Sequence, residues 1–345
     1  MTHAGRNGGT GAHEDARLDV VGIGNAIVDV LTHAHEEFLE AHGLVKGAMT
    51  LVDGETSARI YAGMGPAVEV SGGSCANSMA GAAALGARVA YVGKVRDDQL
   101  GQFFAHDIRA AGVAYDVAPA TEGPPTARCM VMVTPDAHRT MATYLGASTE
   151  LGPEDIDRDL FRAARVTYLE GYLWDPPRAK QAMRVAMEAA VDAGRMVALS
   201  LSDSFCVERH RDEFLELLDR HLTVLFANEH EVMALVGGDD VWEAVARVQG
   251  RCPIVVVTRS DQGALVVTPD EVHEVPAAHV DRVVDTTGAG DLFAAGFLVG
   301  LTRGWPLTEC ARAGAAAAAE VISHFGARPE EDLNVVVGVA IREEA

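Results

Sequence analysis

The sequence predicts an α/β protein in which a doubly wound, mostly parallel sheet carries a small inserted β lid. From about residue 151 onward, β-branched runs alternate strictly with amphipathic runs, as in ARVTYLEGY followed by PRAKQAMRVAMEAAVDAG. Such alternation predicts parallel strands joined by crossover helices. The first half contains short β segments that break the alternation, which indicates a second, smaller sheet. Hydrophobic residues make up 48% of the 345 residues and charged residues 23%, so a large core is expected.

The first ordered element is expected within residues 18–30, where the run LDVVGIGNAIVDV predicts a buried strand that ends near Gly24. Residues 1–17 lack the apolar stretch of a secretory signal and are predicted to form a flexible leader. Further short strands are expected at 45–53, 68–71, 113–118 and 126–134. A Thr-Pro-Asp turn follows TARCMVMV, and RTMATYLG after it completes a predicted hairpin.

The remaining elements follow in order. The Ala-rich run SCANSMAGAAALGA predicts a helix, AYVGKV a strand and residues 99–111 a helix. After residue 151, the strand–helix pairs are followed by the hairpin-like GALVVTPDEVHEVPA and by C-terminal helices. The predicted large domain therefore comprises residues 18–30, 72–111 and 149–345, and the predicted lid comprises residues 31–71 and 112–148.

Charge and cysteine content limit the classes of function. The formal net charge is −22, and such a field repels nucleic acid, so a phosphate-binding site would need its own local positive groups. The five cysteines are scattered and form no C-x-x-C pair, which argues against disulfides or a zinc site and indicates a reducing, cytoplasmic location. No apolar run has the length of a membrane span.

The strongest chemical signal is the segment DTTGAGD, residues 285–291, which leads directly into the helical run LFAAGFLVGL. A glycine-rich turn at a helix start leaves backbone N–H groups unpaired, and the helix dipole adds positive charge there. We therefore expect Gly288, Ala289 and Gly290 to bind a phosphate through their amides. Asp291 at the mouth of this loop can accept a proton from an attacking hydroxyl. A plain turn with Asp291 as an N-cap is the simpler alternative.

The sequence resembles the PfkB (ribokinase-like) family of carbohydrate kinases. DTTGAGDLFAAGF is similar to the C-terminal signature of that family, and GGSCANSMAGAAALG to its N-terminal signature. The similarity extends over about residues 18–330 and matches the adenosine kinase branch best. It implies a ribokinase-like fold and a purine-salvage reaction in which ATP phosphorylates the 5′-hydroxyl of a nucleoside, adenosine giving AMP, with Asp291 as the base.

Substrate residues follow from the same resemblance. GNAIVD places polar side chains after the first strand, where an amide and a carboxylate can grip a polyol. Taken alone, these residues are better explained by a turn with an Asx cap. The resemblance assigns ribose binding to Asn25 and Asp29. It places Ile27 beside the nucleobase. It also assigns sugar binding to Gly73, Ser74 and Asn77, with the glycine pair as a lid hinge. Tyr172 and Phe205 are expected to form two aromatic walls around a purine.

A second group of residues is expected around the phosphates. Arg139 on the lid hairpin is expected to reach the transferred phosphoryl group. The resemblance assigns Asn228 and Glu231 to Mg²⁺ through water, although helix capping explains both residues too. It assigns ATP contacts to Thr258, Arg259, Gly263 and Thr287. Asp285 is the expected ligand of a monovalent cation such as K⁺, but Glu330 replaces the small hydroxyl residue common there, which leaves that site open.

Three alternatives remain at this stage. A PfkB-type kinase could act on a free sugar, a sugar acid or another nucleoside. A nucleotide-sensing binding protein on the same fold would be expected to lose Asp291 or the loop glycines, all of which are present. A Rossmann dehydrogenase would need G-x-G-x-x-G, whereas GIGNAI offers only G-x-G. The expected partners are small molecules, and both a monomer and a homodimer remain open.

Overall fold

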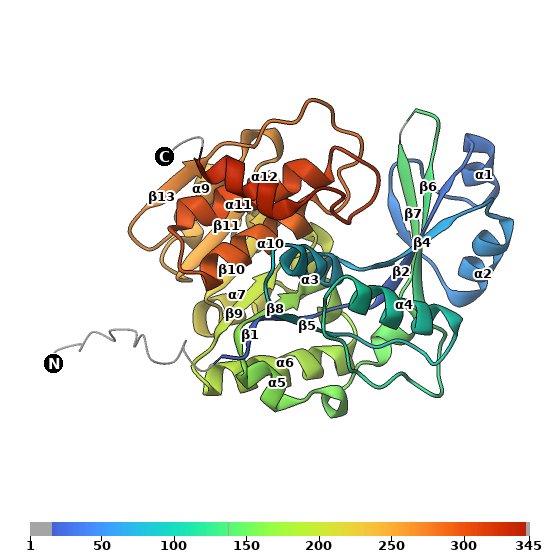
Figure 1. Cartoon of the computed structure of the whole chain (residues 1–345), viewed down its shortest axis with the longest axis horizontal. Coiled ribbons are helices and arrows are strands. Elements are labelled where there is room, and N and C mark those ends of the chain that lie inside the picture. Colours follow the sequence, from blue (N-terminus) through green and yellow to red (C-terminus); the bar gives the residue numbers. More distant parts are fainter. Residues whose placement is uncertain (1–15, 137, 343–345) are drawn as a thin grey trace.

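The computed structural model describes residues 16–136 and 138–342, which form two sheets (Figure 1). The larger sheet has eight strands in the order β13-β12-β11-β10-β9-β8-β1-β5, and the smaller has five in the order β3-β7-β6-β2-β4. The predicted fold class, a mostly parallel α/β sheet with a small β lid, is confirmed. The predicted leader, residues 1–17, falls almost entirely outside the described residues.

All neighbouring strands of the large sheet from β5 to β11 run parallel, and β12 and β13 add an antiparallel edge. The sequences of these strands are continuous apolar runs, which is typical of parallel strands in a sheet covered on both faces. The strands are β1 (Leu18–Ile23), β5 (Val89–Val92), β8 (Ala164–Glu170), β9 (Met196–Ser200), β10 (Val224–Asn228), β11 (Ile254–Thr258), β12 (Ala264–Val267) and β13 (Val272–Val275).

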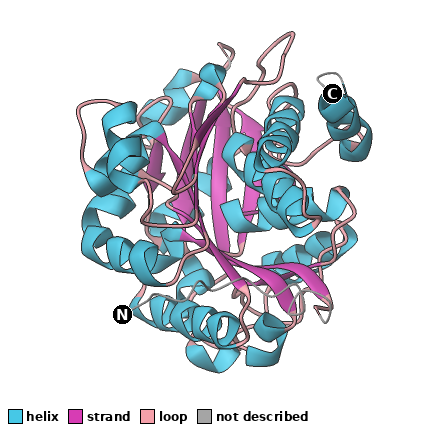
Figure 2. Cartoon of the chain, turned by 90° about the vertical axis from the view of Figure 1, so that its left-hand side faces the viewer, coloured by secondary structure: helices cyan, strands magenta, loops and turns pink. Residues whose placement is uncertain are grey.

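Helices cover both faces of the large sheet, as Figure 2 shows. Each face has its own buried apolar cluster. One face is covered by α3 (Ser74–Ala84), α4 (Gln99–Ala110), α10 (Ala289–Thr302), α11 (Leu307–Val321) and α12 (Leu333–Arg342). The other is covered by α5 (Arg158–Arg162), α6 (Pro177–Asp192), α7 (Ser204–Arg220), α8 (Glu229–Val236) and α9 (Val241–Val248). Short 3₁₀ turns lie at Gly146–Glu150, Pro153–Asp155, Gly171–Trp174 and Ser260–Gln262.

The small sheet contains the predicted hairpin as the antiparallel pair β6 and β7. One of its faces packs on two helices that the sequence analysis did not anticipate, through buried residues such as Leu39, Ile60 and Met130. The elements of this lid are β2 (Ile27–His33), α1 (Glu36–Ala41), β3 (Met49–Leu51), α2 (Gly54–Gly63), β4 (Val68–Gly72), β6 (Ala127–Val133) and β7 (Arg139–Tyr144).

Strand pairing divides the chain differently from the predicted domain limits. β2 pairs with β4 and β6, so residues 27–30 belong to the small sheet rather than to the large domain. The predicted strand at 113–118 is reduced to a single bridge between Ala90 and Ala114, beside β5. The apolar pattern continues from β1 into β2 without a break, and pairing partners are set by distant strands, so the change of sheet is not visible locally. We propose that the domains follow the two sheets.

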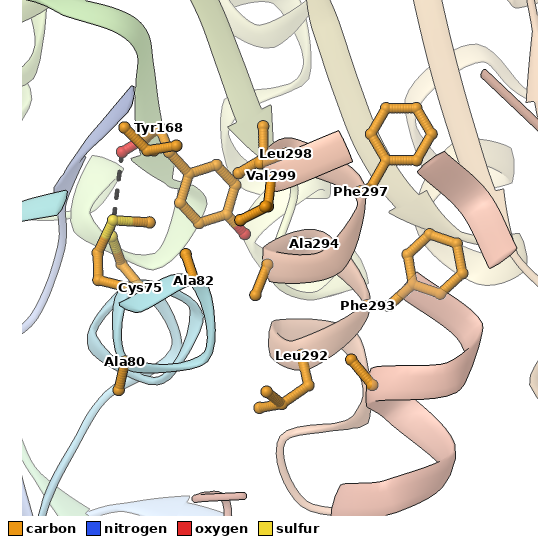
Figure 3. Packing of buried hydrophobic residues seen from close by; sticks show 14 of the residues in the cluster. Cys75, Ala80, Ala82, Tyr168, Leu292, Phe293, Ala294, Phe297, Leu298 and Val299 are labelled. Carbon is orange, nitrogen blue, oxygen red and sulfur yellow. Dashed lines mark hydrogen bonds between the residues drawn. The ribbon is translucent and has the colours of Figure 1, made fainter. Parts of the chain in front are cut away.

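Close helix packing holds the segment that begins with the glycine-rich loop. Figure 3 shows one buried cluster that contains Cys75 of α3, Tyr168 of β8 and, from α10, Leu292, Phe293, Ala294, Phe297, Leu298 and Val299. α10 packs on α11 through glycines at both helices. A Cβ at Gly296 would lie 2.5 Å from the Ala313 carbonyl oxygen, and one at Gly314 would lie 2.6 Å from that of Phe293. These glycines set how closely α11 supports α10.

The five cysteines are all buried and unpaired, in agreement with the sequence-based expectation of no disulfide framework. Among the described residues, none of the helices combines the length and apolar character that a membrane span requires.

Replacement of Gly296 by alanine should destabilise the protein by about 1–3 kcal/mol, because the added methyl must push the two helix backbones apart. Gly338 in α12 is a matched control, since a Cβ there meets nothing within 4 Å. Gly338→Ala should be neutral or stabilising by up to about 1 kcal/mol. Urea unfolding of both variants measures the difference, and equal stabilities would contradict the packing argument.

Candidate active site

The glycine-rich loop forms an open backbone cradle before α10. Gly288 is the N-cap residue and has φ +80°, a left-handed conformation that favours glycine. Among the described residues, the amides of Gly288 and Gly290 have no backbone acceptor, whereas the Ala289 amide makes a 3.3 Å contact with the Thr286 carbonyl. A Cβ at Gly290 would meet nothing within 4 Å, so space lies in front of the loop. The loop therefore offers at least two free donors at the positive end of a helix.

Asp291 lies at this helix start, and α3 holds its carboxylate in place. The Ser74 hydroxyl donates to Oδ1 at 2.6 Å, and the Asn77 amide donates to Oδ2 at 3.0 Å. Burial raises the pKa of Asp291, and the two hydrogen bonds oppose this shift. A raised pKa suits a general base, because it increases the affinity of the carboxylate for a proton. The other side-chain atom of Asn77, Oδ1, is buried and has no partner among the described residues.

Asp29 is the second carboxylate that faces the loop. It lies on β2 of the lid, beside Gly72. A Cβ added at Gly72 would lie 2.2 Å from the Oδ2 atom of Asp29. Burial raises the pKa of Asp29 to about 7, with the charge of Arg328 lowering it and that of Asp291 raising it. Among the described residues, no donor forms a hydrogen bond with its carboxylate oxygens. These oxygens are also not fully buried, so a ligand can reach them. They are therefore free to accept hydroxyl protons from a ligand.

Asn25 is instead held by protein partners. Its amide nitrogen donates to Glu170 at 2.7 Å, and its Oδ1 accepts from the Ser148 hydroxyl at 2.9 Å. Glu170 also accepts from the backbone amide of Cys75 at 2.9 Å. Burial raises the pKa of Glu170 to about 7. The Asn25 carbonyl lies 2.2 Å from where a Cβ of Gly73 would be, and Gly73 has φ +96°, so only glycine fits there.

Glu170 is a site residue that sequence reasoning missed. It ends β8 and joins the loop after β1 to the start of α3 through three hydrogen bonds. A lone acid at the end of an apolar strand, as in VTYLEG, was the available signal, because open α/β sheets place ligands at these strand ends.

Arg139 reaches from the lid to the glycine-rich loop. Its Nη1 donates to the Thr287 hydroxyl at 2.5 Å, its Nη2 pairs with Asp285, and its guanidinium lies 4.6 Å from the centre of the Phe325 ring. Asp285 is buried and also accepts from the amides of Thr287, at 3.0 Å, and Gly326, at 2.9 Å. The residue expected to bind a monovalent cation is thus paired with a guanidinium in this conformation.

Asn228 and Glu231 form a capping box at the start of α8. The Asn228 side chain accepts from the Glu231 amide at 2.9 Å, and Glu231 accepts from the amide of Asn228 at 2.9 Å. Burial raises the pKa of Glu231 to about 7, and the negative charge of Asp203 adds to this shift. The helix capping that also explains these two residues is therefore present. A hard cation would relieve the repulsion between the carboxylates of Glu231 and Asp203. Asn228 and Glu231 therefore also fit Mg²⁺ held through water.

The two predicted aromatic residues differ in burial. Tyr172 lies in the turn after β8, where burial raises its pKa and the charges of Asp203, Glu231, Glu170 and Asp291 add to the shift. Phe205 is 70% exposed, and among the described residues no ring contact joins it to Tyr172.

Thr258 ends β11, and Arg259 follows it as the residue before the turn Ser260–Gln262. The Arg259 guanidinium lies near Glu229, at 3.6 Å, and Glu274, at 3.4 Å, and over the Trp242 ring. Gly263 has φ +83°, and a Cβ there would lie 2.1 Å from the Val275 carbonyl oxygen, so it is required by the turn itself. These contacts give Arg259 and Gly263 a structural role, to which a role toward ATP would be added.

Comparison with known proteins agrees with this geometry. The model of the "pfkB family carbohydrate kinase" matches residues 65–333. Adenosine kinase from Sinorhizobium meliloti is 50% identical, with a TM-score of 0.88 over 96% of this chain and 100% of that one. A probable sugar kinase protein from Rhizobium etli CFN 42 is 48% identical, with a TM-score of 0.89 over 94% and 99%.

A cytidine kinase from Thermococcus kodakarensis is 28% identical over 268 residues, which cover 76% of this chain and 91% of the relative. These proteins act on different acceptors, but all are kinases of small molecules by name. With a family match over most of the chain, and with the loop, the carboxylate and the lid in place, this chain belongs to the pfkB family of carbohydrate kinases and is a phosphotransferase that acts on a hydroxyl group of a sugar or nucleoside.

Proposed function

We propose that this kinase phosphorylates the 5′-hydroxyl of a nucleoside, adenosine first among them, with ATP as the phosphoryl donor. The observation that best supports a nucleoside substrate is the composition of one face of the lid sheet. This face bears Asp29 and Arg139, which places it toward the glycine-rich loop, because Arg139 contacts Thr287. Its other side chains are mostly apolar, whereas a free sugar presents hydroxyls on most of its surface and would need polar partners.

Strand register identifies the members of this face. Met49 pairs with Met141 and Leu51 with Thr143, so these edge residues share the face with Asp29. Leu51 is 57% exposed although it is apolar, and it lines a cavity of about 270 Å³ together with Thr143 and the segment 144–146. An apolar wall beside a carboxylate suits a ligand with a flat base and a polar ribose. The buried apolar residues of the face are Leu31, Cys129, Val131 and Val133, with Ile27, Val70 and Met141 packed against them.

The proposed reaction uses the geometry around α10. Asp291 accepts the proton of the attacking hydroxyl, while Ser74 and Asn77 orient its carboxylate. The Asn77 Oδ1 and the Asp29 carboxylate accept hydrogen bonds from substrate hydroxyls. The free loop amides stabilise charge on the transferring phosphoryl group, and Arg139 adds positive charge from the lid. Closing of the lid over this group excludes water and limits ATP hydrolysis.

Asn228 and Glu231 are proposed to order the waters of Mg²⁺, which would neutralise phosphate charge when bound. ATP contacts at Thr258, Arg259, Gly263 and Thr287 remain part of the proposal. Activation by K⁺ at Asp285 requires Arg139 to leave that carboxylate. We expect this movement to accompany the binding of ATP, because a triphosphate attracts the guanidinium more strongly.

A kinase of a free sugar or a different nucleoside is the alternative, supported by the likeness to the Rhizobium etli protein. Release of ADP should be measured with adenosine, cytidine, ribose, fructose and a sugar acid in parallel, with and without K⁺. Adenosine should give the highest kcat/KM, because only a nucleoside fills the apolar lid face. A higher kcat/KM for ribose or fructose would overturn the nucleoside assignment and leave the kinase intact.

Asp291→Asn should lower kcat by about 10²–10⁴-fold, because the amide keeps the shape of the side chain but cannot take the proton. Binding of adenosine, measured by calorimetry, should stay within a few-fold of the wild-type value. Asp98→Asn is a control, since Asp98 caps α4 and binds Thr126, and among the described residues it has no hydrogen bond to the glycine-rich loop. A kcat close to wild type in Asp291→Asn would refute the assignment of the base.

Asp29 should make the ligand-free protein less stable as the pH rises. Its pKa is about 7 in the folded state against an ordinary value of 3.8, so the folded protein holds a proton that the unfolded chain releases. The stability that this proton provides is present below about pH 4 and is lost progressively up to about pH 7. Urea unfolding from pH 4 to pH 8 should show a smaller decline for Asp29→Asn than for the wild type. Glu170 and Glu231 titrate in the same direction, so part of the decline should persist.

A further inference from the structure

Arg328 lies behind the carboxylates that face the substrate, although neither signature segment contains it. It belongs to the loop between α11 and α12. Its Nη1 donates to the carbonyl of Ala76, in the first turns of α3, at 3.0 Å, and its Nη2 donates to the Ser71 hydroxyl at 2.9 Å and to the Ser71 carbonyl. Ser71 is the last residue but one of the lid strand β4, which ends at Gly72, and Gly73 follows. One guanidinium therefore holds both sides of the glycine pair that joins the lid to α3.

The lid strand is fixed at the same point by an acid. Asp107 of α4 accepts from the Ser71 amide at 2.9 Å and from the Ser71 hydroxyl at 2.6 Å. Ser71 is fully buried, so these bonds are not open to exchange with water at the surface. The chain on the lid side of the hinge is thus clamped between Asp107 and Arg328.

Arg328 is also the positive charge that opposes the burial of two site carboxylates. Its charge lowers the pKa of Asp29 and that of Asp291, both of which burial raises. Burial in turn lowers the pKa of Arg328, and the charges of Asp107, Asp29 and Asp291 oppose that shift. In a chain with a net charge of −22, this counter-charge is local and specific to the site.

Neighbouring residues of the same loop contact the other working parts. The Phe325 ring lies under the Arg139 guanidinium, the Gly326 amide donates to Asp285 at 2.9 Å, and Ala327 packs against Gly288. Consecutive residues of one loop therefore touch the lid arginine, the glycine-rich loop and the hinge.

We propose that Arg328 is a positioning residue for phosphoryl transfer, which clamps the glycine pair between the lid and α3 and provides a positive charge for Asp29 and Asp291. This inference rests on the proposed function. It separates two contributions of one side chain: a positive charge, which lysine can replace, and a planar two-nitrogen clamp, which lysine cannot.

The test compares Arg328→Met, Arg328→Lys and, as a matched control, Arg251→Met, which removes a paired arginine far along the chain from the loop. Protein labelled with ¹³C at the aspartate carboxyl carbons is titrated by NMR, with Asp291→Asn to assign the signal. The pH dependence of kcat and the KM of the acceptor are measured on the same variants. Circular dichroism melting shows that each variant is folded.

In Arg328→Met, the titration midpoint of Asp291 should rise by about one pH unit, because an attractive charge is lost. The acidic limb of kcat should move upward by the same amount, so activity falls about tenfold below the limb and recovers at higher pH. Arg328→Lys should keep the midpoint but raise the acceptor KM several-fold, because one ammonium cannot bridge Ser71 and Ala76. Arg251→Met should change neither quantity.

The shift can be attributed to Arg328 because the other groups that face Asp291 are unchanged in these variants. They are the acids Asp29 and Glu170, the donors Ser74 and Asn77, and the neutral groups Cys75, Tyr168 and Tyr172.

An unmoved Asp291 midpoint in folded Arg328→Met would overturn the inference, whether or not the enzyme proves active. If Arg328→Met does not fold, Arg328→Lys decides: a raised KM with an unmoved midpoint supports the clamp, and a wild-type KM overturns it. A wild-type protein that transfers phosphate to no nucleoside or sugar would overturn the proposed function alone, because the NMR midpoints still test Arg328.

Discussion

The architecture depends on backbone amides left unpaired where a glycine turn enters α10. A protein with a net charge of −22 repels the phosphates that a kinase must gather. Main-chain donors solve this problem without a cluster of basic side chains, since they carry fixed dipoles that need no counter-ion. The left-handed Gly288 aims them outward, and the close contact of α10 with α11 through Gly296 and Gly314 keeps the helix start in place.

Several acidic side chains with raised pKa values lie in the region of the candidate site. Burial raises the pKa of Asp29, Glu170 and Glu231 to about 7 and also raises that of Asp291. Such groups cost stability in the free protein and are retained where a ligand, a cation or a transferred proton can use them. Arg139 and Arg328 offset part of this cost from opposite sides, one from the lid and one from the loop after α11.

The lid joins the two halves of the chemistry. Its inner face carries Asp29 and Arg139 among apolar side chains, and its outer face is sealed by α1 and α2. Because both polar residues lie on one sheet, a single rigid movement can bring the substrate carboxylate and the lid arginine to the phosphate together. The glycine pair at residues 72–73 is one of the connections between the lid and the helices of the large sheet.

The sequence by itself determined the parts that are contiguous in the chain. These are the turn DTTGAGD, its Asp291, the capping pair at Asn228, the hairpin and the strand–helix alternation, because each depends on neighbours a few residues away. Only the tertiary structure decided which distant groups meet. Ser74 and Asn77 reach Asp291 across 217 and 214 residues, and Glu170 reaches Asn25 across 145. Contacts of this kind leave no periodic trace in a single sequence, since they arise from sheet register and helix packing, which also moved β2 into the lid and gave Arg328 its place.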